Sequence, residues 1–199
     1  LIRDGRGWDN KDRTSAYDQM SADQLLERLG SWSPVVRERA AIALARRKDA
    51  PVPALVVGAL ANLLESPALE ARYGACQALI ALQKRAEPAI EPLRKALAAK
   101  DLWLRIKAAE ALASIGPAAM RTVPEILELL AQVDVANDPR GMQQRYLTFA
   151  LFDRELGGML SHSLEGVDTE ALYRAVKAGL KNQDGRARGS IGSVYRNLS

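Results

Sequence analysis

The sequence is poor in the residue types that most often carry chemistry. Of 199 residues, one is cysteine, one is histidine and 5% are aromatic. A single cysteine, Cys76, excludes an internal disulfide and a cluster of thiolate metal ligands. Because His162 is the one histidine, the usual zinc ligand sets are also excluded. We therefore expect neither a metal site nor a cofactor.

Long hydrophobic runs and strand-like patterns are also missing. No apolar run reaches the roughly 18 to 20 residues that cross a bilayer, so we expect no membrane partner. Alternating stretches rich in valine or isoleucine are absent, and no segment therefore has a clear strand signal. The chain begins at Leu1 without a methionine or a signal-like segment. We interpret it as a piece of a longer polypeptide, and its cellular location stays open.

What is present is a composition rich in alanine and leucine, with an excess of arginine. Hydrophobic residues make up 48% of the chain, which is typical of a globular protein and, with so few aromatics, favours helices over sheets. The formal net charge is +4, and 20 of the 28 basic residues are arginine. Arginine suits carboxylate and phosphate partners because its planar fork donates two parallel hydrogen bonds. A charge of +4 over this length is small for a dedicated nucleic-acid binder.

A short pattern recurs three times along the chain. It begins at Arg37, Arg72 and Arg105 and reads Arg-x-x-Ala-(Ala/Cys)-x-Ala-Leu each time, at spacings of 35 and 33 residues. On a helix, these positions place a narrow alanine face and one leucine on the same side. Narrow faces let neighbouring helices pack closely, as stacked repeats require. Self-similarity at this period is typical of helical repeat proteins.

Capping signals divide the chain into helix pairs. Ser21 and Gln24 form a capping-box pattern, while Ser33, Ser66 and Asp138 each precede a proline, a residue favoured at the first helical position. The five predicted pairs are 22–30 with 34–47, 52–65 with 67–84, 88–99 with 102–115, 118–132 with 139–156 and 168–182 with 185–198.

The two ends of the pattern define the expected domain organisation. Residues 1–20 have no apolar period and are predicted to be a linker or arm from a larger parent protein, followed by one repeat domain over residues 21–199. The connection at residues 155–168 is longer than the others and contains two adjacent glycines. Its length makes it a candidate functional loop.

The combined pattern resembles HEAT repeats. A helix with proline near its front precedes a helix that reads Val/Leu-Arg-x-x-Ala-x-x-Ala-Leu, and Ile115-Gly116-Pro117-Ala118-Ala119 is similar to the junction between repeats in the short bacterial form, which is also found in phycobilisome-lyase-type proteins. The resemblance is good over residues 34–131 and weaker over 139–199. It implies an all-α, right-handed α-solenoid of about five HEAT-like helical hairpins, and it favours binding over catalysis.

Candidate catalytic groups lack a recognisable arrangement. Cys76 occupies an alanine position of the repeat, which indicates a small buried residue. The sequence has no Gly-x-Ser-x-Gly motif that would supply a nucleophilic serine for His162 to activate. Glu125 and Glu128 are predicted to lie on the polar face of a helix, where carboxylates are usually solvated. We therefore lean against an enzyme but leave the question open.

The resemblance also indicates where a partner would bind. In HEAT-like stacks the second helix of each pair lines the concave side, which implies a mildly basic inner surface here. The candidate binding residues on these helices are Arg37, Arg72, Trp103, Arg105, Arg145 and Arg188. The recurrent arginines either contact a partner or bond carbonyls of neighbouring turns. Trp103 either anchors a peptide or a base, or packs beneath the turn between helices.

Three functions fit this interpretation. The first is a non-enzymatic protein–protein interaction or scaffold module that binds an acidic partner on the mildly basic concave face. The second is a nucleic-acid-binding HEAT protein similar to DNA glycosylases, which predicts a steep dependence on salt. The third, a lyase or chaperone for a bilin chromophore, depends on the resemblance alone.

Overall fold

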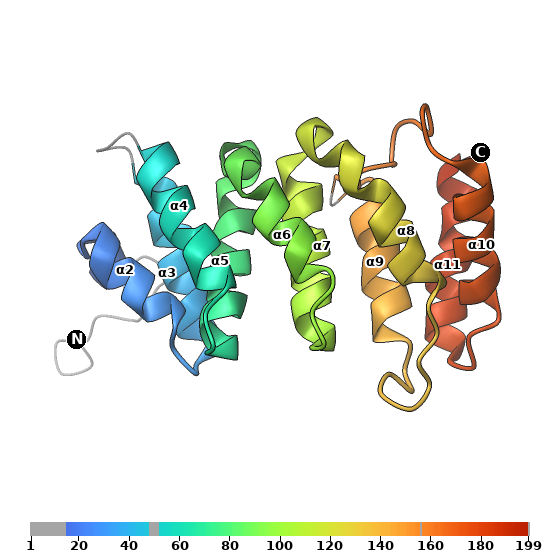
Figure 1. The fold of residues 1–199 in the computed structure, drawn as a ribbon, viewed down its shortest axis with the longest axis horizontal. Coiled ribbons are helices and arrows are strands. Elements are labelled where there is room, and N and C mark those ends of the chain that lie inside the picture. Colours follow the sequence, from blue (N-terminus) through green and yellow to red (C-terminus); the bar gives the residue numbers. More distant parts are fainter. Residues whose placement is uncertain (1–14, 48–51, 156, 199) are drawn as a thin grey trace, which may run out of the picture. The chain divides into compact units, whose positions relative to one another are not determined.

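The chain is all-helical wherever its structure is described. The computed structural model describes residues 15–47, 52–155 and 157–198, and every regular element in these ranges is a helix, as Figure 1 shows. The predicted all-α class is therefore confirmed. Residues 1–14, most of the predicted linker, lie outside the described part. The chain forms two compact units, Leu1–Leu82 and Gln83–Ser199, which are described separately below.

Unit 1 contains two helix pairs. These are α2 (Ala22–Leu29) with α3 (Pro34–Arg46), and α4 (Val52–Leu64) with α5 (Leu69–Leu82). The predicted capping box opens α2, because the side chains of Ser21 and Gln24 each accept a hydrogen bond from the backbone N–H of the other. The second helices of the two pairs, α3 and α5, pack side by side.

Unit 2 contains three helix pairs, and the first helix of two of them begins with a 3₁₀ segment. The elements are η1 (Gln83–Ala89), α6 (Ile90–Ala96) and α7 (Leu102–Ile115); η2 (Pro117–Thr122), α8 (Val123–Ala131) and α9 (Met142–Phe152); and α10 (Thr169–Leu180) with α11 (Gly185–Leu198). Proline lies inside η1 and opens η2, where it removes a backbone donor from the regular helix pattern. The second helices α7, α9 and α11 pack in sequence, and α8 packs on α10, as is visible in Figure 1.

Most predicted helix limits are close to those observed, but α9 is shorter at both ends than the predicted 139–156. This helix begins at Met142 and not at residue 139. The Asp138 carboxylate accepts hydrogen bonds from the backbone N–H groups of Met142 and Gln143, both at 2.8 Å. Gly141 has a left-handed backbone with φ of 58°, which breaks the helical path between the proline and the first helical residue.

The recurring alanine and leucine positions form the core, as the repeat pattern predicts. The three leucines of the pattern, Leu44, Leu79 and Leu112, have no exposed surface. The small residues of the pattern are at most 4% exposed: Ala40, Ala41, Ala43, Ala75, Cys76, Ala78, Ala108, Ala109 and Ala111. The stripe is therefore a packing surface for neighbouring helices.

A glycine permits the closest helix contact in unit 1. A Cβ atom added to Gly74 in α5 would lie 2.1 Å from the carbonyl oxygen of Leu29, at the end of α2. No side chain fits at that distance, so the backbones of α2 and α5 approach each other only because this residue is glycine. Gly58 in α4 is different, because nothing lies within 4 Å of its Cβ position.

These two glycines give a matched test of the packing. Alanine is favoured over glycine in an exposed helix by about 0.5–1 kcal/mol, so Gly58→Ala should raise the free energy of unfolding by about that amount. Gly74→Ala should lower it by about 1–3 kcal/mol, because the added methyl group overpacks the contact with Leu29. Urea denaturation followed by circular dichroism measures both. A similar gain in stability for the two variants would contradict the packing described here.

Candidate functional site

The recurrent arginines bond the turn that precedes their own helix. Nη1 of Arg37 donates to the carbonyl oxygens six and five residues before it, at 2.6 and 3.0 Å. Arg105 makes the same two contacts at 2.8 and 2.9 Å, and Arg188 makes them at 2.6 and 2.8 Å. Arg72 donates through Nε to the carbonyl oxygen six residues before it. Of the two interpretations of the recurrent arginines, bonding to turn carbonyls is therefore observed, whereas contact with a partner remains a prediction.

Two adjacent glutamines take over this role in the fourth helix pair. Gln143 Oε1 accepts a hydrogen bond from Arg105 Nε at 2.8 Å. Gln144 Nε2 donates to the carbonyl oxygen of Gln132 at the end of α8, and its Oε1 accepts from Asn182 Nδ2 at 3.1 Å. Both glutamines are buried. Together they connect α9 to the helix pairs on either side of it, so a ladder of buried polar contacts crosses unit 2.

Arg145 differs from the other candidate arginines because it has no comparable acceptor. Its Nη1 lies 3.4 Å from Met142 Sδ, a weak acceptor, and its Nε is buried without a partner. Among the described residues, no oxygen accepts a hydrogen bond from its side chain. The pKa of Asp184 is lowered, mainly because its carboxylate accepts a hydrogen bond from the backbone N–H of Ala187. The positive charges of Arg145 and Arg186 lower this pKa further. Arg145 is thus a cation with unused donors on α9.

Trp103 lies against the aromatic side chains of α9. Its ring centroid is 5.6 Å from that of Tyr146, with an interplanar angle of 67°, and Tyr146 lies 6.1 Å from Phe149 at 87°. Such edge-to-face pairs are favourable arrangements of aromatic rings. Trp103 still exposes 40% of its surface. The structure therefore brings Trp103 close to α9, the helix that carries Arg145, and leaves part of the indole accessible.

A polar pocket of about 260 Å³ lies between the start of α7 and the segment that follows α8. Its lining includes two cations, Lys100 and Arg105, but three carboxylates, Asp101, Asp134 and Asp138. Each carboxylate has an internal hydrogen bond: Asp101 and Asp138 accept from helix N–H groups, and a bond from a neighbouring asparagine lowers the pKa of Asp134. These acids therefore stabilise the local fold.

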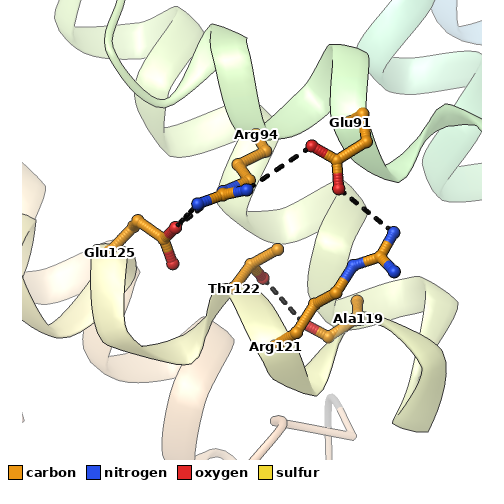
Figure 2. Close-up of polar contacts among 6 residues, drawn as sticks. All are labelled: Glu91, Arg94, Ala119, Arg121, Thr122 and Glu125. Carbon is orange, nitrogen blue, oxygen red and sulfur yellow. Dashed lines mark hydrogen bonds and ion pairs between the residues drawn. The ribbon is translucent and has the colours of Figure 1, made fainter.

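Exposed ion pairs join α6 to η2 and α8 in unit 2. Arg94 lies between Glu125 and Glu91, and Arg121 also contacts Glu91 (Figure 2). The N–O distances are 2.5 Å for Arg94–Glu125, 3.5 Å for Arg94–Glu91 and 3.2 Å for Arg121–Glu91. The hydrogen bond to Glu125, followed by its charge, raises the pKa of Arg94 above its ordinary value. Glu125, considered above as an acid–base candidate, is thus engaged in an ion pair. Exposed pairs of this kind contribute little to stability.

The remaining candidates are not brought together. Cys76 is fully buried in α5, as its repeat position predicts, and His162 is exposed. In the long connection, Met159 donates to the carbonyl oxygen of Ala150, so this segment folds back on α9. No group of three or more His, Cys, Asp or Glu side chains in the described ranges is arranged to bind a metal ion. None of the described helices has the length and apolar character that a membrane crossing needs.

Successive helix pairs with a recurring arginine and alanine pattern define the class of an α-solenoid repeat protein. The family model for HEAT repeats matches residues 22–113, slightly less than half of the chain. These residues are similar to HEAT repeats, which generally mediate protein–protein interaction or scaffolding. No curated protein matches the sequence. Among solved structures, an engineered protein is 21% identical, covering 90% of this chain and 97% of its own, with a TM-score of 0.40.

The sequence interpretation missed the glutamine ladder and the aromatic neighbours of Trp103. Two consecutive glutamines near a helix start form no distinctive sequence pattern. Their role is visible only in their contacts with residues far away in the sequence. The signal for Tyr146 and Phe149 was present, because these large side chains replace smaller ones of the earlier repeats.

A double-mutant cycle tests the ladder. Gln144→Ala should lower the free energy of unfolding by about 1–3 kcal/mol, because Asn182 and the carbonyl of Gln132 lose a buried partner. Asn182→Ala should have a similar cost. The double variant should cost clearly less than the sum of the two, as measured by urea denaturation. Strict additivity would show that the two side chains do not interact.

The arginines give a second test. Arg105→Gln should lower the free energy of unfolding by about 1–3 kcal/mol because two turn carbonyls and Gln143 lose their donor. Arg145→Gln should change it by less than about 0.5 kcal/mol, as is usual for partly exposed side chains without strong partners. Thermal melts of both variants make the comparison. If Arg145→Gln is the more damaging change, the assignment of the two roles is wrong.

Proposed function

We propose that the chain is a non-enzymatic protein-interaction or scaffold module, and that unit 2 binds an acidic segment of a partner protein on α7 and α9. We name this surface the α7–α9 face. We define it by second-helix residues of α7 and α9 that keep exposed surface: Trp103, Lys107, Glu110, Met142, Arg145, Tyr146 and Phe149. Trp103 and Arg145 contact the partner directly, while the recurrent arginines position the turns at the helix starts.

The single observation that carries this proposal is the unused hydrogen-bonding capacity of Arg145. A guanidinium that finds only a thioether acceptor retains donors for a ligand. Carboxylates match these donors in charge and geometry, and such hydrogen bonds are stronger than neutral ones. By contrast, Arg105 and Arg188 each donate to two carbonyl oxygens of their own chain. Arg145 is therefore the candidate arginine best supplied with free donors.

The charges of the α7–α9 face favour a protein partner over a nucleic acid. Lys107 is paired with Glu110 at 2.6 Å. The positive charge of Arg145 contributes to the lowered pKa of Asp184, so these two groups lie near each other. The face thus combines one cation with open donors and the carboxylate of Glu110, and the carboxylate of Asp184 lies nearby. A phosphate backbone presents many negative charges and is bound by several cations together. A glycosylase-like activity would need a free carboxylate beside the aromatics, and Glu110 is instead held by Lys107.

Selection from a phage-displayed library of random dodecapeptides on the full chain tests the proposal. We expect the selected peptides to be enriched in Asp and Glu. Arg145→Gln should weaken their binding about tenfold or more, because a hydrogen bond to a charged group contributes about 1.5–3 kcal/mol and 1.4 kcal/mol is a factor of ten. Arg174→Gln, which removes the same charge from the exposed side of α10, is the matched control and should leave binding unchanged.

The opposite results are equally clear. Enrichment of basic peptides, or equal binding by the wild type and Arg145→Gln, would reject the acidic partner. Tight binding of a labelled single-stranded oligonucleotide, with an affinity that falls steeply as salt rises, would favour the nucleic-acid alternative.

A further inference from the structure

The aromatic side chains beside Arg145 narrow the kind of partner. Resting on the proposed function above, we infer that the α7–α9 face binds a peptide segment in which a carboxylate stands next to a large apolar side chain. Arg145 binds the carboxylate, and Trp103, Tyr146 and Phe149 form the surface for the apolar side chain. We name these four residues the aromatic–arginine site.

Packing of the repeat does not require an aromatic residue at position 103. Trp103 lies two residues before the recurrent Arg105, and the equivalent residues before Arg37 and Arg72 are Val35 and Glu70. An aliphatic and a charged side chain are thus compatible with the same place in the repeat. Trp103 nevertheless keeps 40% of its surface exposed. Tryptophan, tyrosine and arginine are the residue types enriched at interface hot spots, and Trp103 packs against Tyr146 on the helix that carries Arg145.

The helix geometry of α9 places the apolar and charged parts of the site together. Phe149 follows Arg145 by four residues and Tyr146 by three, so it shares a helix face with each of them. Tyr146 in turn contacts both Phe149 and Trp103 edge-on. The rings therefore form a continuous surface that begins on α7 and continues onto the face of α9 that Phe149 shares with Arg145. A side chain that covers the rings brings its neighbour in the same peptide within reach of Arg145.

Charge explains why one carboxylate is expected and not a row of them. Arg145 is the cation of this face without an acidic hydrogen-bond partner among the described residues, since Lys107 is paired with Glu110 at 2.6 Å. A second acidic group on the ligand would approach Glu110 or Asp184, which repel it. Apolar contact with the rings must then supply the rest of the affinity, as it does at interfaces with few charges.

Nuclear magnetic resonance with short peptides tests the inference on the full chain. The probes are three acetylated tetrapeptides with amidated ends: Gly-Phe-Glu-Gly, Gly-Ala-Glu-Gly and Gly-Phe-Gln-Gly. The Phe-Glu peptide should shift the indole N–H of Trp103 and the Nε–H of Arg145. We expect the other two to bind about tenfold more weakly, since each lacks one of the two contacts.

Variants assign each contact to its residue. Trp103→Leu preserves apolar packing on α9 and should reduce the affinity for the Phe-Glu peptide to that of the Ala-Glu peptide, whose own affinity should not change. Arg145→Gln should reduce the affinity for the Phe-Glu peptide to that of the Phe-Gln peptide. Trp32→Leu removes an indole that is 84% exposed in unit 1 and is the control that should bind every probe as the wild type does.

The outcomes separate the two proposals. Equal affinity for the Phe-Glu and Ala-Glu peptides, both weakened by Arg145→Gln, would overturn the inference and leave the acidic partner standing. Binding that is insensitive to Arg145→Gln would overturn both. The inference also fails if no probe shifts the Trp103 indole, whereas the library selection with Arg145→Gln decides the proposed function by itself. Shifts of the same indole by oligothymidylate, stronger than by any peptide, would replace the peptide with a nucleic acid.

Discussion

Close packing of second helices across a stripe of small side chains is the constraint on which the rest of the structure depends. Alanine faces let the backbones approach, and the buried leucine at the end of each pattern fills the remaining space, as Leu79 and Leu112 do. Because the gap is narrow, the helix starts must be placed accurately. The hydrogen bonds from arginine to the preceding turn provide that placement. This explains why an arginine recurs three residues before the first alanine of each stripe.

The same periodicity explains what was predictable from the sequence. The five helix pairs, the buried alanines and the capping box of Ser21 follow from contacts between residues near in sequence or equivalent in a repeat. The glutamine ladder was not predictable, because Gln144 and Asn182 are 38 residues apart and neither belongs to the repeated pattern. The late start of α9 depends similarly on a local competition, in which Asp138 caps N–H groups four and five residues later.

Candidate binding residues were harder to predict, because one residue type has two roles here. Arg105 and Arg145 lie on neighbouring second helices of unit 2, yet one donates to two carbonyls and a glutamine and the other to a methionine sulfur. Residue type and predicted face are the same for both. What separates them is recurrence: an arginine that returns with the repeat has a partner supplied by the repeat, whereas Arg145 is not at the recurrent position.

This distinction gives a physical reason to look for binding at the positions that vary. The repeat fixes its buried positions, because any enlargement there separates helices that need close contact. It leaves the exposed second-helix positions free, and these hold Val35, Glu70 and Trp103 at one equivalent place. Packing does not select an indole at position 103, so it does not explain the half-exposed Trp103 beside aromatic rings. Packing also does not explain why Arg145 has no oxygen acceptor in the described part of the chain. The ligand that we propose, apolar at one end and negatively charged at the other, accounts for both features at once.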